Sequence, residues 1–191
     1  MSAKHQPIIV ITAPSGSGKT TLIRRLMEAL PELSFSVSAS TRAPRAGETH
    51  GKDYYFFSAD QFKELLEKDA FIEWEMVYEG KYYGTLKTEL DRIRGEQKIP
   101  LVDIDVKGAL TVQGKYPENA VTIFIRTPSL EVLRERLTAR GTETPETLEE
   151  RVAKAAEEQE FAHHFDHIVV NDDLEKAVAE ITDIVHRYVR A

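Results

Sequence analysis

One stretch near the start of the chain decides the fold: Ile8-Ile9-Val10-Ile11-Thr12-Ala13-Pro14-Ser15-Gly16-Ser17-Gly18-Lys19-Thr20-Thr21. Its continuous apolar start predicts a buried strand of a parallel sheet, and its last residues predict the beginning of a helix. The loop between them contains glycine, and its backbone N–H groups can surround a phosphate that the positive end of the helix also attracts. The stretch therefore predicts a phosphate-binding loop, or P-loop.

The residue types in this loop carry specific chemistry. Lys19 is expected to reach the β- and γ-phosphates of a nucleotide, and the Thr20 hydroxyl is expected to bind Mg²⁺. Ala13 stands where glycine is usual, which is a mild change if Ala13 has a negative φ. The alternative is a turn that only joins a strand to a helix. The predicted ATP-binding residues of the loop are Ala13, Pro14, Ser15, Gly16, Ser17, Gly18, Lys19, Thr20 and Thr21.

Bulk composition limits the possible functions. A chain of 191 residues can bury one sizeable core and still carry a small inserted subdomain. The net charge of −7 argues against broad nucleic-acid binding. The chain has no cysteine, and it has no apolar run of membrane-spanning length and no signal peptide, so we expect a cytoplasmic protein with no membrane partner.

Strands and helices alternate on both sides of the middle section, which predicts a parallel sheet wound with helices. The stretch from about 37 to 89 is richer in short strands and aromatic residues, and it predicts an inserted α+β lobe. Other local patterns predict one strand over Phe35–Ser40, a helix over Thr85–Arg94, and a helix that begins at Thr127-Pro128 and runs through Ala139.

A second motif lies in this inserted stretch. Arg42 and Arg45 are three residues apart, Pro44 stiffens the loop between them, and Tyr54 follows nearby. Arginine forks match phosphate oxygens bidentately, so the motif predicts a site for a compact dianion. The alternative is a solvated basic loop.

Together with the P-loop, this motif resembles the guanylate kinase family. Further matches cover nearly the whole chain: Phe71-Ile72-Glu73-Trp74, Tyr82-Tyr83-Gly84-Thr85, Leu101-Val102-Asp103-Ile104-Asp105, Arg140-Gly141-Thr142-Glu143 and Val170-Asn171-Asp172-Asp173. The resemblance implies the P-loop nucleoside monophosphate kinase fold in one domain over 1–191. It further implies a core of 1–36 and 90–191, a GMP-binding lobe of about 37–89 and a lid of about 140–158.

The activity that the resemblance implies is transfer of the γ-phosphoryl group of MgATP to GMP, and to dGMP, giving ADP and GDP for guanine nucleotide biosynthesis and recycling. Arg42, Arg45, Tyr54 and Tyr83 match the ligands of the GMP phosphate, and Ser38, Glu73, Thr85 and Asp105 match the residues around guanine. Guanine presents N1–H and its amino group as adjacent donors, which one carboxylate can accept together. Adenine has an acceptor at N1, so a carboxylate disfavours it; the alternative for Glu73 is a surface carboxylate.

The remaining implied roles concern phosphoryl transfer. Asp103 ends a buried strand and is expected to hold Mg²⁺, partly through water. It is also one of the predicted GMP-binding residues. The expected catalytic residues are Lys19, Arg45, Arg136, Arg140 and Arg151, with a structural ion pair as the alternative for Arg151. Asn171 resembles a contact to the adenine edge, and its alternative role, together with Asp172, is a helix N-cap.

Two other functions remain possible at this point. One is a catalytically inactive guanylate-kinase-like module that binds phosphopeptides, although such modules typically lack an intact P-loop and its lysine. The other is a kinase of the same fold for a different small phosphate, which should lack the residues that recognise guanine.

The spacing of His163, His164 and His167 would allow a metal site. However, the segment passes from the end of a helix into a strand, so the three side chains do not share one face, and surface and packing roles are preferred.

Overall fold

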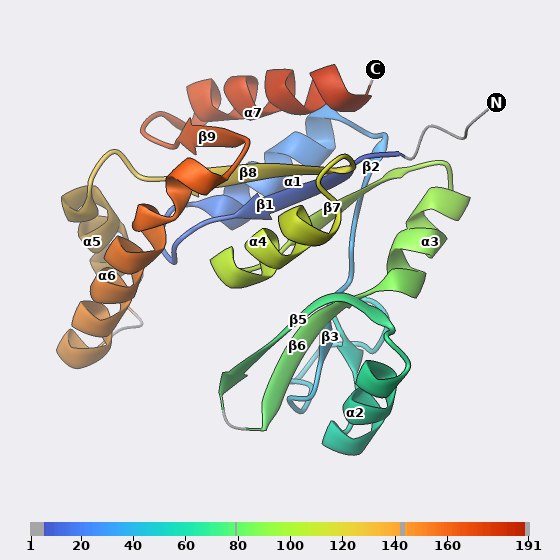
Figure 1. Ribbon diagram of the computed structural model, residues 1–191. Helices are drawn as coiled ribbons and strands as arrows, with labels where there is room; N and C mark the ends of the chain where they lie inside the picture. Colours follow the sequence, from blue (N-terminus) through green and yellow to red (C-terminus); the bar gives the residue numbers. More distant parts are fainter. Residues whose placement is uncertain (1–5, 79, 142–143, 190–191) are drawn as a thin grey trace.

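A five-stranded parallel sheet forms the centre of the larger part of the computed structural model, which describes residues 6–78, 80–141 and 144–189 (Figure 1). Every neighbouring pair in this sheet is parallel, which confirms the predicted architecture. Its strands, in spatial order, are β2 (Leu33–Phe35), β7 (Ile99–Asp103), β1 (Ile8–Thr12), β8 (Ala120–Arg126) and β9 (His167–Val170).

Helices cover both faces of this sheet (Figure 1). On one face, α1 (Lys19–Ala29) and α7 (Leu174–Val189) bury their apolar stripes against β1, β7 and β8. On the other face lie α3 (Lys87–Gly95), α4 (Val106–Lys115) and the short 3-10 helix Ala162–His164. The helices α5 (Leu130–Ala139) and α6 (Pro145–Glu160) pack on each other at one end of the sheet, around Leu133, Leu137, Val152 and Ala155.

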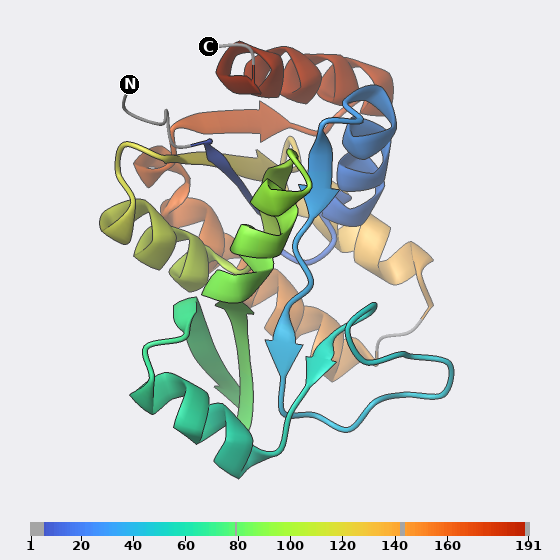
Figure 2. The ribbon, with the colours of Figure 1, turned by 90° about the vertical axis from the view of Figure 1, so that its right-hand side faces the viewer.

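A second sheet lies apart from the first, and with α2 (Ala59–Glu67) it forms what we call the smaller lobe (Figure 2). Its strand order is β4 (Tyr55–Phe56), β3 (Ala39–Ser40), β6 (Lys81–Leu86) and β5 (Phe71–Tyr78). The Phe62 ring of α2 stacks on Phe71 at a centroid distance of 4.5 Å and on Tyr82 at 5.4 Å. Phe62, Phe71 and Tyr82 therefore belong to a small core of the lobe's own.

Two predicted elements of this region are wrong in their bounds. Phe35–Ser40 is not one strand: β2 ends at Phe35 in the parallel sheet, β3 begins at Ala39 in the smaller lobe, and residues 36–38 cross between them (Figure 2). Alternation alone cannot show that a chain changes sheets. The helix predicted from Thr85 begins only at Lys87, because Thr85 pairs with Glu73 in the β5–β6 ladder.

The predicted start of α5 at Thr127-Pro128 is also wrong. The N-cap is Ser129, whose hydroxyl accepts from the Val132 N–H at 3.3 Å, whereas the Thr127 hydroxyl donates to the Ser129 carbonyl at 2.7 Å. Thr127 directly follows β8 and is buried, and its hydroxyl bonds to a carbonyl and not to an N–H of the first turn of α5. The matching prediction at Thr144-Pro145 is confirmed as a capping box.

Parts of some predicted segments lie outside the described residues, namely Met1–His5 at the N-terminus, Glu79 between β5 and β6, and Thr142 with Glu143 in the predicted lid. Among the residues that are described, no helix combines the length and the apolar character that crossing a membrane requires.

Candidate active site

The P-loop lies at the carboxyl edge of the parallel sheet, where ligands bind in folds of this kind. The chain leaves β1 at Thr12 and enters α1 at Lys19, and Gly16 and Gly18 take φ values of +92° and +87°, which favour glycine. The Ser17 hydroxyl closes the loop by donating to the Pro14 carbonyl at 2.7 Å. Outside glycine, positive φ occurs in the described chain only at Asp69 and Gln97, so Ala13 has the negative φ that its side chain needs.

Asn171 supports this loop from the end of β9. It is only 5% exposed, and its amide nitrogen donates to the Ser17 carbonyl at 2.8 Å. A Cβ atom on Gly18 would lie 2.4 Å from that nitrogen, so the close approach requires glycine. Asn171 is not an N-cap, which corrects the alternative prediction: α7 begins at Leu174, and the Asp173 carboxylate accepts from the Lys176 N–H at 2.9 Å.

Lys19 and Asp103 form an ion pair. The pair arises directly from the topology, because Asp103 ends β7 opposite Ile11 of β1, just before the P-loop. Both side chains are about four-fifths covered, with exposures of 21% and 24%. The two charged groups that the sequence assigned to the phosphates and to Mg²⁺ are therefore adjacent.

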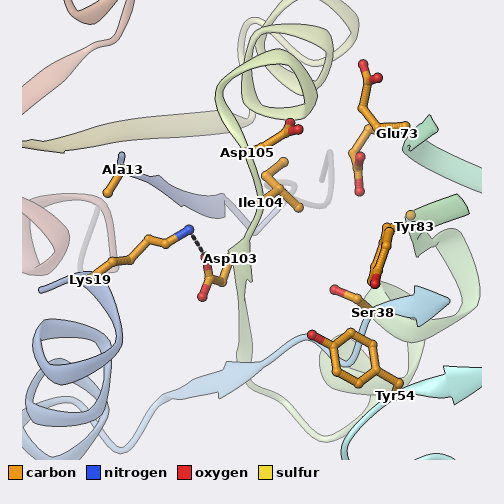
Figure 3. A pocket seen from close by; sticks show the side chains of 11 residues that line it. Ala13, Lys19, Ser38, Tyr54, Glu73, Tyr83, Asp103, Ile104 and Asp105 are labelled. Carbon is orange, nitrogen blue, oxygen red and sulfur yellow. Dashed lines mark ion pairs between the residues drawn. The ribbon is translucent and has the colours of Figure 1, made fainter. Parts of the chain in front are cut away.

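A cavity of about 380 Å³, which we call cavity A, lies between the P-loop and the smaller lobe. Figure 3 shows Lys19 and Asp103 on one side of it and Ser38, Tyr54, Glu73 and Tyr83 on the other, with Asp105 and Ile104 between them. Six of the predicted GMP residues therefore line one cavity. Arg42, Arg45 and Thr85 do not line it, whereas Glu75 does and was not predicted.

Glu73 is the most unusual group in cavity A. The side chain is 3% exposed, and its Oε1 accepts from the Thr85 hydroxyl at 2.6 Å. Helix α4 comes close because Gly108 has no side chain: a Cβ atom there would lie 2.9 Å from Glu73 Oε2. Burial raises the pKa of Glu73 to about 7, and the negative charge of Asp105 raises it further. The hydrogen bond from Thr85 acts in the opposite direction and lowers it.

The predicted dianion motif is organised by a residue that the sequence did not single out. Glu48 accepts from both terminal nitrogens of Arg42, at 2.6 and 2.7 Å, and from the Arg45 backbone N–H at 2.7 Å. The hydrogen bonds from Arg42 lower the pKa of Glu48 to about 2. The Arg42 guanidinium also lies over the Tyr54 ring at 4.6 Å, so it is fixed beside cavity A, while the Arg45 side chain is exposed.

A second cavity of about 340 Å³, cavity B, lies between the P-loop and helix α6. Arg151 of α6 reaches across it and donates to the Ser15 hydroxyl at 3.1 Å. Arg136 does not line this cavity; it donates to the Asn171 carbonyl at 2.9 Å. The lining residues are Ala13, Pro14, Ser15, Gly16, Lys19, Thr20, Arg140, Arg151, Lys154, Ala155 and Glu158.

Lys154 and Glu158 were not predicted to be part of the site. Lys154 follows Arg151 by three residues and so lies on the same helical face, a signal that was present in the sequence. Burial raises the pKa of Glu158.

The three histidines that suggested a metal site do not line either cavity. The ring centroids of His163 and His164 are 4.0 Å apart, and His167 Nε2 is 2.8 Å from the Tyr188 hydroxyl. Within the described ranges, no group of three potential ligands is arranged to hold a metal ion.

Comparisons with known proteins agree on one family. The family model described as guanylate kinase matches residues 4–188. The guanylate kinase of Porphyromonas gingivalis is 46% identical over 183 residues, covering 95% of this chain and 97% of that protein. The guanylate kinase of Gloeobacter violaceus is 49% identical over 175 residues, covering 91% and 84%. A crystal structure of guanylate kinase from Anaplasma phagocytophilum matches with a TM-score of 0.73 and 31% identity, covering 95% of this chain and 85% of that one.

Proposed function

Because the chain belongs to the guanylate kinase family, which transfers a phosphoryl group from ATP to GMP, we propose a binding site for each nucleotide. Cavity A binds GMP, and cavity B holds the triphosphate of ATP. The observation that carries this assignment is the wall that the cavities share, since Ala13 and Lys19 line both of them. A phosphoryl group that leaves cavity B therefore meets Lys19 as it enters cavity A. Direct transfer between two bound nucleotides requires such a junction.

Glu73 reads the guanine base. Its carboxylate accepts from guanine N1–H and from the amino group, with Thr85 holding the carboxylate in place through Oε1. Ser38 and Asp105 complete the base pocket, although Asp105 also caps α4 by accepting from the Gly108 N–H at 2.8 Å. A buried acceptor that is matched to two donors rejects bases without them, because its own hydrogen bonds are then lost.

The GMP phosphate lies at the tyrosine end of cavity A. Tyr54 and Tyr83 line the cavity with their rings edge to face, and Arg42 is held beside them by Glu48. Glu48 accepts from both terminal nitrogens of Arg42 and so holds the guanidinium in one orientation. This lowers the entropic cost of engaging a phosphate with the N–H groups of Arg42 that Glu48 does not occupy. Arg45 approaches from the exposed loop. The dGMP phosphate and base make the same contacts, so dGMP is also a substrate.

Transfer itself depends on charge stabilisation. The P-loop N–H groups and Lys19 hold the β- and γ-phosphates, and Arg140 and Arg151 stabilise the charge on the transferred group from the lid side. Arg136 acts indirectly: it donates to the Asn171 carbonyl, and the Asn171 side chain in turn donates to Ser17 of the P-loop. A contact of Asn171 with adenine stays a prediction. No general base is required, because the accepting phosphate oxygen is already anionic.

Magnesium is the cofactor that guanylate kinases use with ATP. The residues that would hold it here are Thr20, which lines cavity B, and Asp103, at the junction with cavity A. Hydroxyl and carboxylate oxygens suit Mg²⁺, which keeps several waters as well, so these residues fit the ion. When bound with ATP, the ion neutralises charge on the β- and γ-phosphates.

The raised pKa of Glu73 leads to a pH prediction. Only the carboxylate form accepts both guanine donors, so we expect the ionisation of Glu73 by itself to raise kcat/KM for GMP about tenfold per pH unit below pH 7 and to have no further effect above it. Steady-state kinetics between pH 5.5 and 8.5, at saturating MgATP, measures this profile.

Glu73→Gln is the matched control for the profile, because the phosphate of GMP also titrates in this range. The variant keeps the titration of the substrate and removes that of Glu73, so its profile should lack the additional rise. Identical profiles for the two proteins would contradict the assignment of Glu73.

We further propose that the enzyme works in the cytoplasm, consistent with a chain that contains no cysteine.

A further inference from the structure

Glu89 is a buried carboxylate that the proposed chemistry does not use. It lies in the first turn of α3 and is 1% exposed. Its Oε1 accepts from the Val37 backbone N–H at 3.0 Å and from Arg92 Nη2 at 2.8 Å, and its Oε2 accepts from the Tyr55 hydroxyl at 2.8 Å and from Arg92 Nε at 2.9 Å. Four hydrogen bonds from three separate segments therefore converge on one side chain.

These segments meet where the chain passes between the two sheets. Val37 belongs to residues 36–38, which lead from β2 into the smaller lobe, and α3 follows β6 where the chain returns (Figure 2). Tyr55 lies on β4, inside the smaller lobe. Glu89 therefore connects α3, by hydrogen bonds, to the segment that enters the smaller lobe and to strand β4 within it.

The two partners of Glu89 outside α3, Val37 and Tyr55, are each adjacent in sequence to a residue that lines cavity A. Ser38 follows Val37, Tyr54 precedes Tyr55, and both Ser38 and Tyr54 line the cavity. The Tyr55 N–H also donates to the Ser38 carbonyl at 2.9 Å, so the two segments are joined to each other as well. A shift of the backbone at Val37 would move Ser38, at the base end of the cavity. A shift at Tyr55 would move Tyr54, at the phosphate end.

We propose that Glu89 is a positioning residue for GMP, which holds Ser38 and Tyr54 at their places in cavity A through Val37 and Tyr55. This inference rests on the proposed assignment of cavity A to GMP. It differs from a simple ion pair with Arg92, because an ion pair within α3 would stabilise that helix without affecting one substrate more than the other.

The charge state of Glu89 suits this role. Burial disfavours the charged form, but the hydrogen bonds from Arg92, the Val37 N–H and Tyr55 together hold its pKa below the ordinary value. Glu89 is therefore a carboxylate throughout the working pH range, and each of its donors bonds to an ionised acceptor. Such bonds are stronger and more directional than neutral ones.

The test compares Glu89→Gln and Tyr55→Phe with the control Glu96→Gln. Glu96 is the other partner of Arg92, and its side chain is half exposed, so its loss leaves the contacts of Glu89 intact. We expect Glu89→Gln to raise KM for GMP about tenfold and Tyr55→Phe to raise it about threefold, with KM for ATP and kcat within about twofold of the starting enzyme. Glu96→Gln should change none of them.

Two results would overturn the inference: equal changes in KM for both substrates, or a lower melting temperature with unchanged kinetics. If Glu89→Gln does not fold, Tyr55→Phe decides, because it removes one hydroxyl and keeps the ion pair with Arg92. Ser38→Ala and Tyr54→Phe separate this inference from the assignment of cavity A. If these two also leave KM for GMP unchanged, the assignment itself fails; if they raise it and Glu89→Gln and Tyr55→Phe do not, only the positioning role fails.

Discussion

Replacing Lys19 with alanine is expected to lower kcat by at least about 1,000-fold. Among the residues that the structure describes, Lys19 is the only basic side chain that lines both cavities. With the proposed assignment of the two cavities, its ammonium group would contact the phosphoryl group on both sides of the transfer. The P-loop backbone and the two arginines that line cavity B, Arg140 and Arg151, remain in the variant, so nucleotide binding should weaken less than turnover.

The experiment measures kcat and both KM values by a coupled assay for ADP. Lys63→Ala, on the exposed side of α2, removes a lysine far from the cavities and serves as the control. Lys19→Ala also leaves Asp103 without its ion-pair partner, so the melting temperature is recorded as well. A folded Lys19→Ala protein that keeps kcat within about tenfold would refute the role of the P-loop lysine.

Glu73→Gln is expected to lower kcat/KM for GMP by about 100- to 1,000-fold, through loss of charge-assisted hydrogen bonds to guanine. The glutamine amide presents one acceptor and one donor, which matches the donor and acceptor on the Watson–Crick edge of adenine better than the two donors of guanine. Preference for GMP over AMP should therefore fall more steeply than turnover of GMP alone. Side-by-side kinetics with the two nucleotides measures the change.

Glu75→Gln is the comparison variant, because it removes a second carboxylate from the wall of cavity A and leaves Glu73 in place. It should keep the preference for GMP. If both variants lose that preference equally, general negative charge in the cavity selects the base, and Glu73 has no special role.

Stability gives Glu73→Gln an independent readout. The pKa of Glu73 in the folded protein is about 7, above the ordinary 4.5, so the folded state holds its proton to higher pH than the unfolded state. The contribution of Glu73 to stability therefore falls as pH rises from 4.5 to 7, by about 3 kcal/mol in total. A neutral glutamine avoids this cost, so the variant should melt at a higher temperature than the starting enzyme at pH 8 and lose this advantage near pH 5.

The P-loop was predictable from sequence because its chemistry is local. A strand, two glycines with positive φ, Lys19 and a helix start follow one another along the chain, so their spacing alone specifies the geometry. The parallel topology then places Asp103 beside the loop, because the carboxyl ends of neighbouring parallel strands meet at one edge.

The partners of the charged groups were not predictable in this way. Nothing in the local sequence pairs Glu89 with Val37, which lies 52 residues away, or shows that α4 approaches Glu73 through Gly108. The raised pKa of Glu73 follows from burial that only the tertiary structure produces. The crossing at residues 36–38 was missed for the same reason, since an alternating pattern continues across a change of sheet.

The most direct measurement of the central claim is ADP release with MgATP and, in separate reactions, GMP, dGMP, AMP, CMP and UMP. We expect efficient turnover of GMP and dGMP, and a kcat/KM for AMP at least about 1,000-fold lower, because in the proposed site the buried Glu73 carboxylate faces the base. Comparable turnover of AMP would contradict the assignment of Glu73. No turnover of any nucleotide, with GMP still bound in calorimetry, would contradict the kinase itself and favour a binding module.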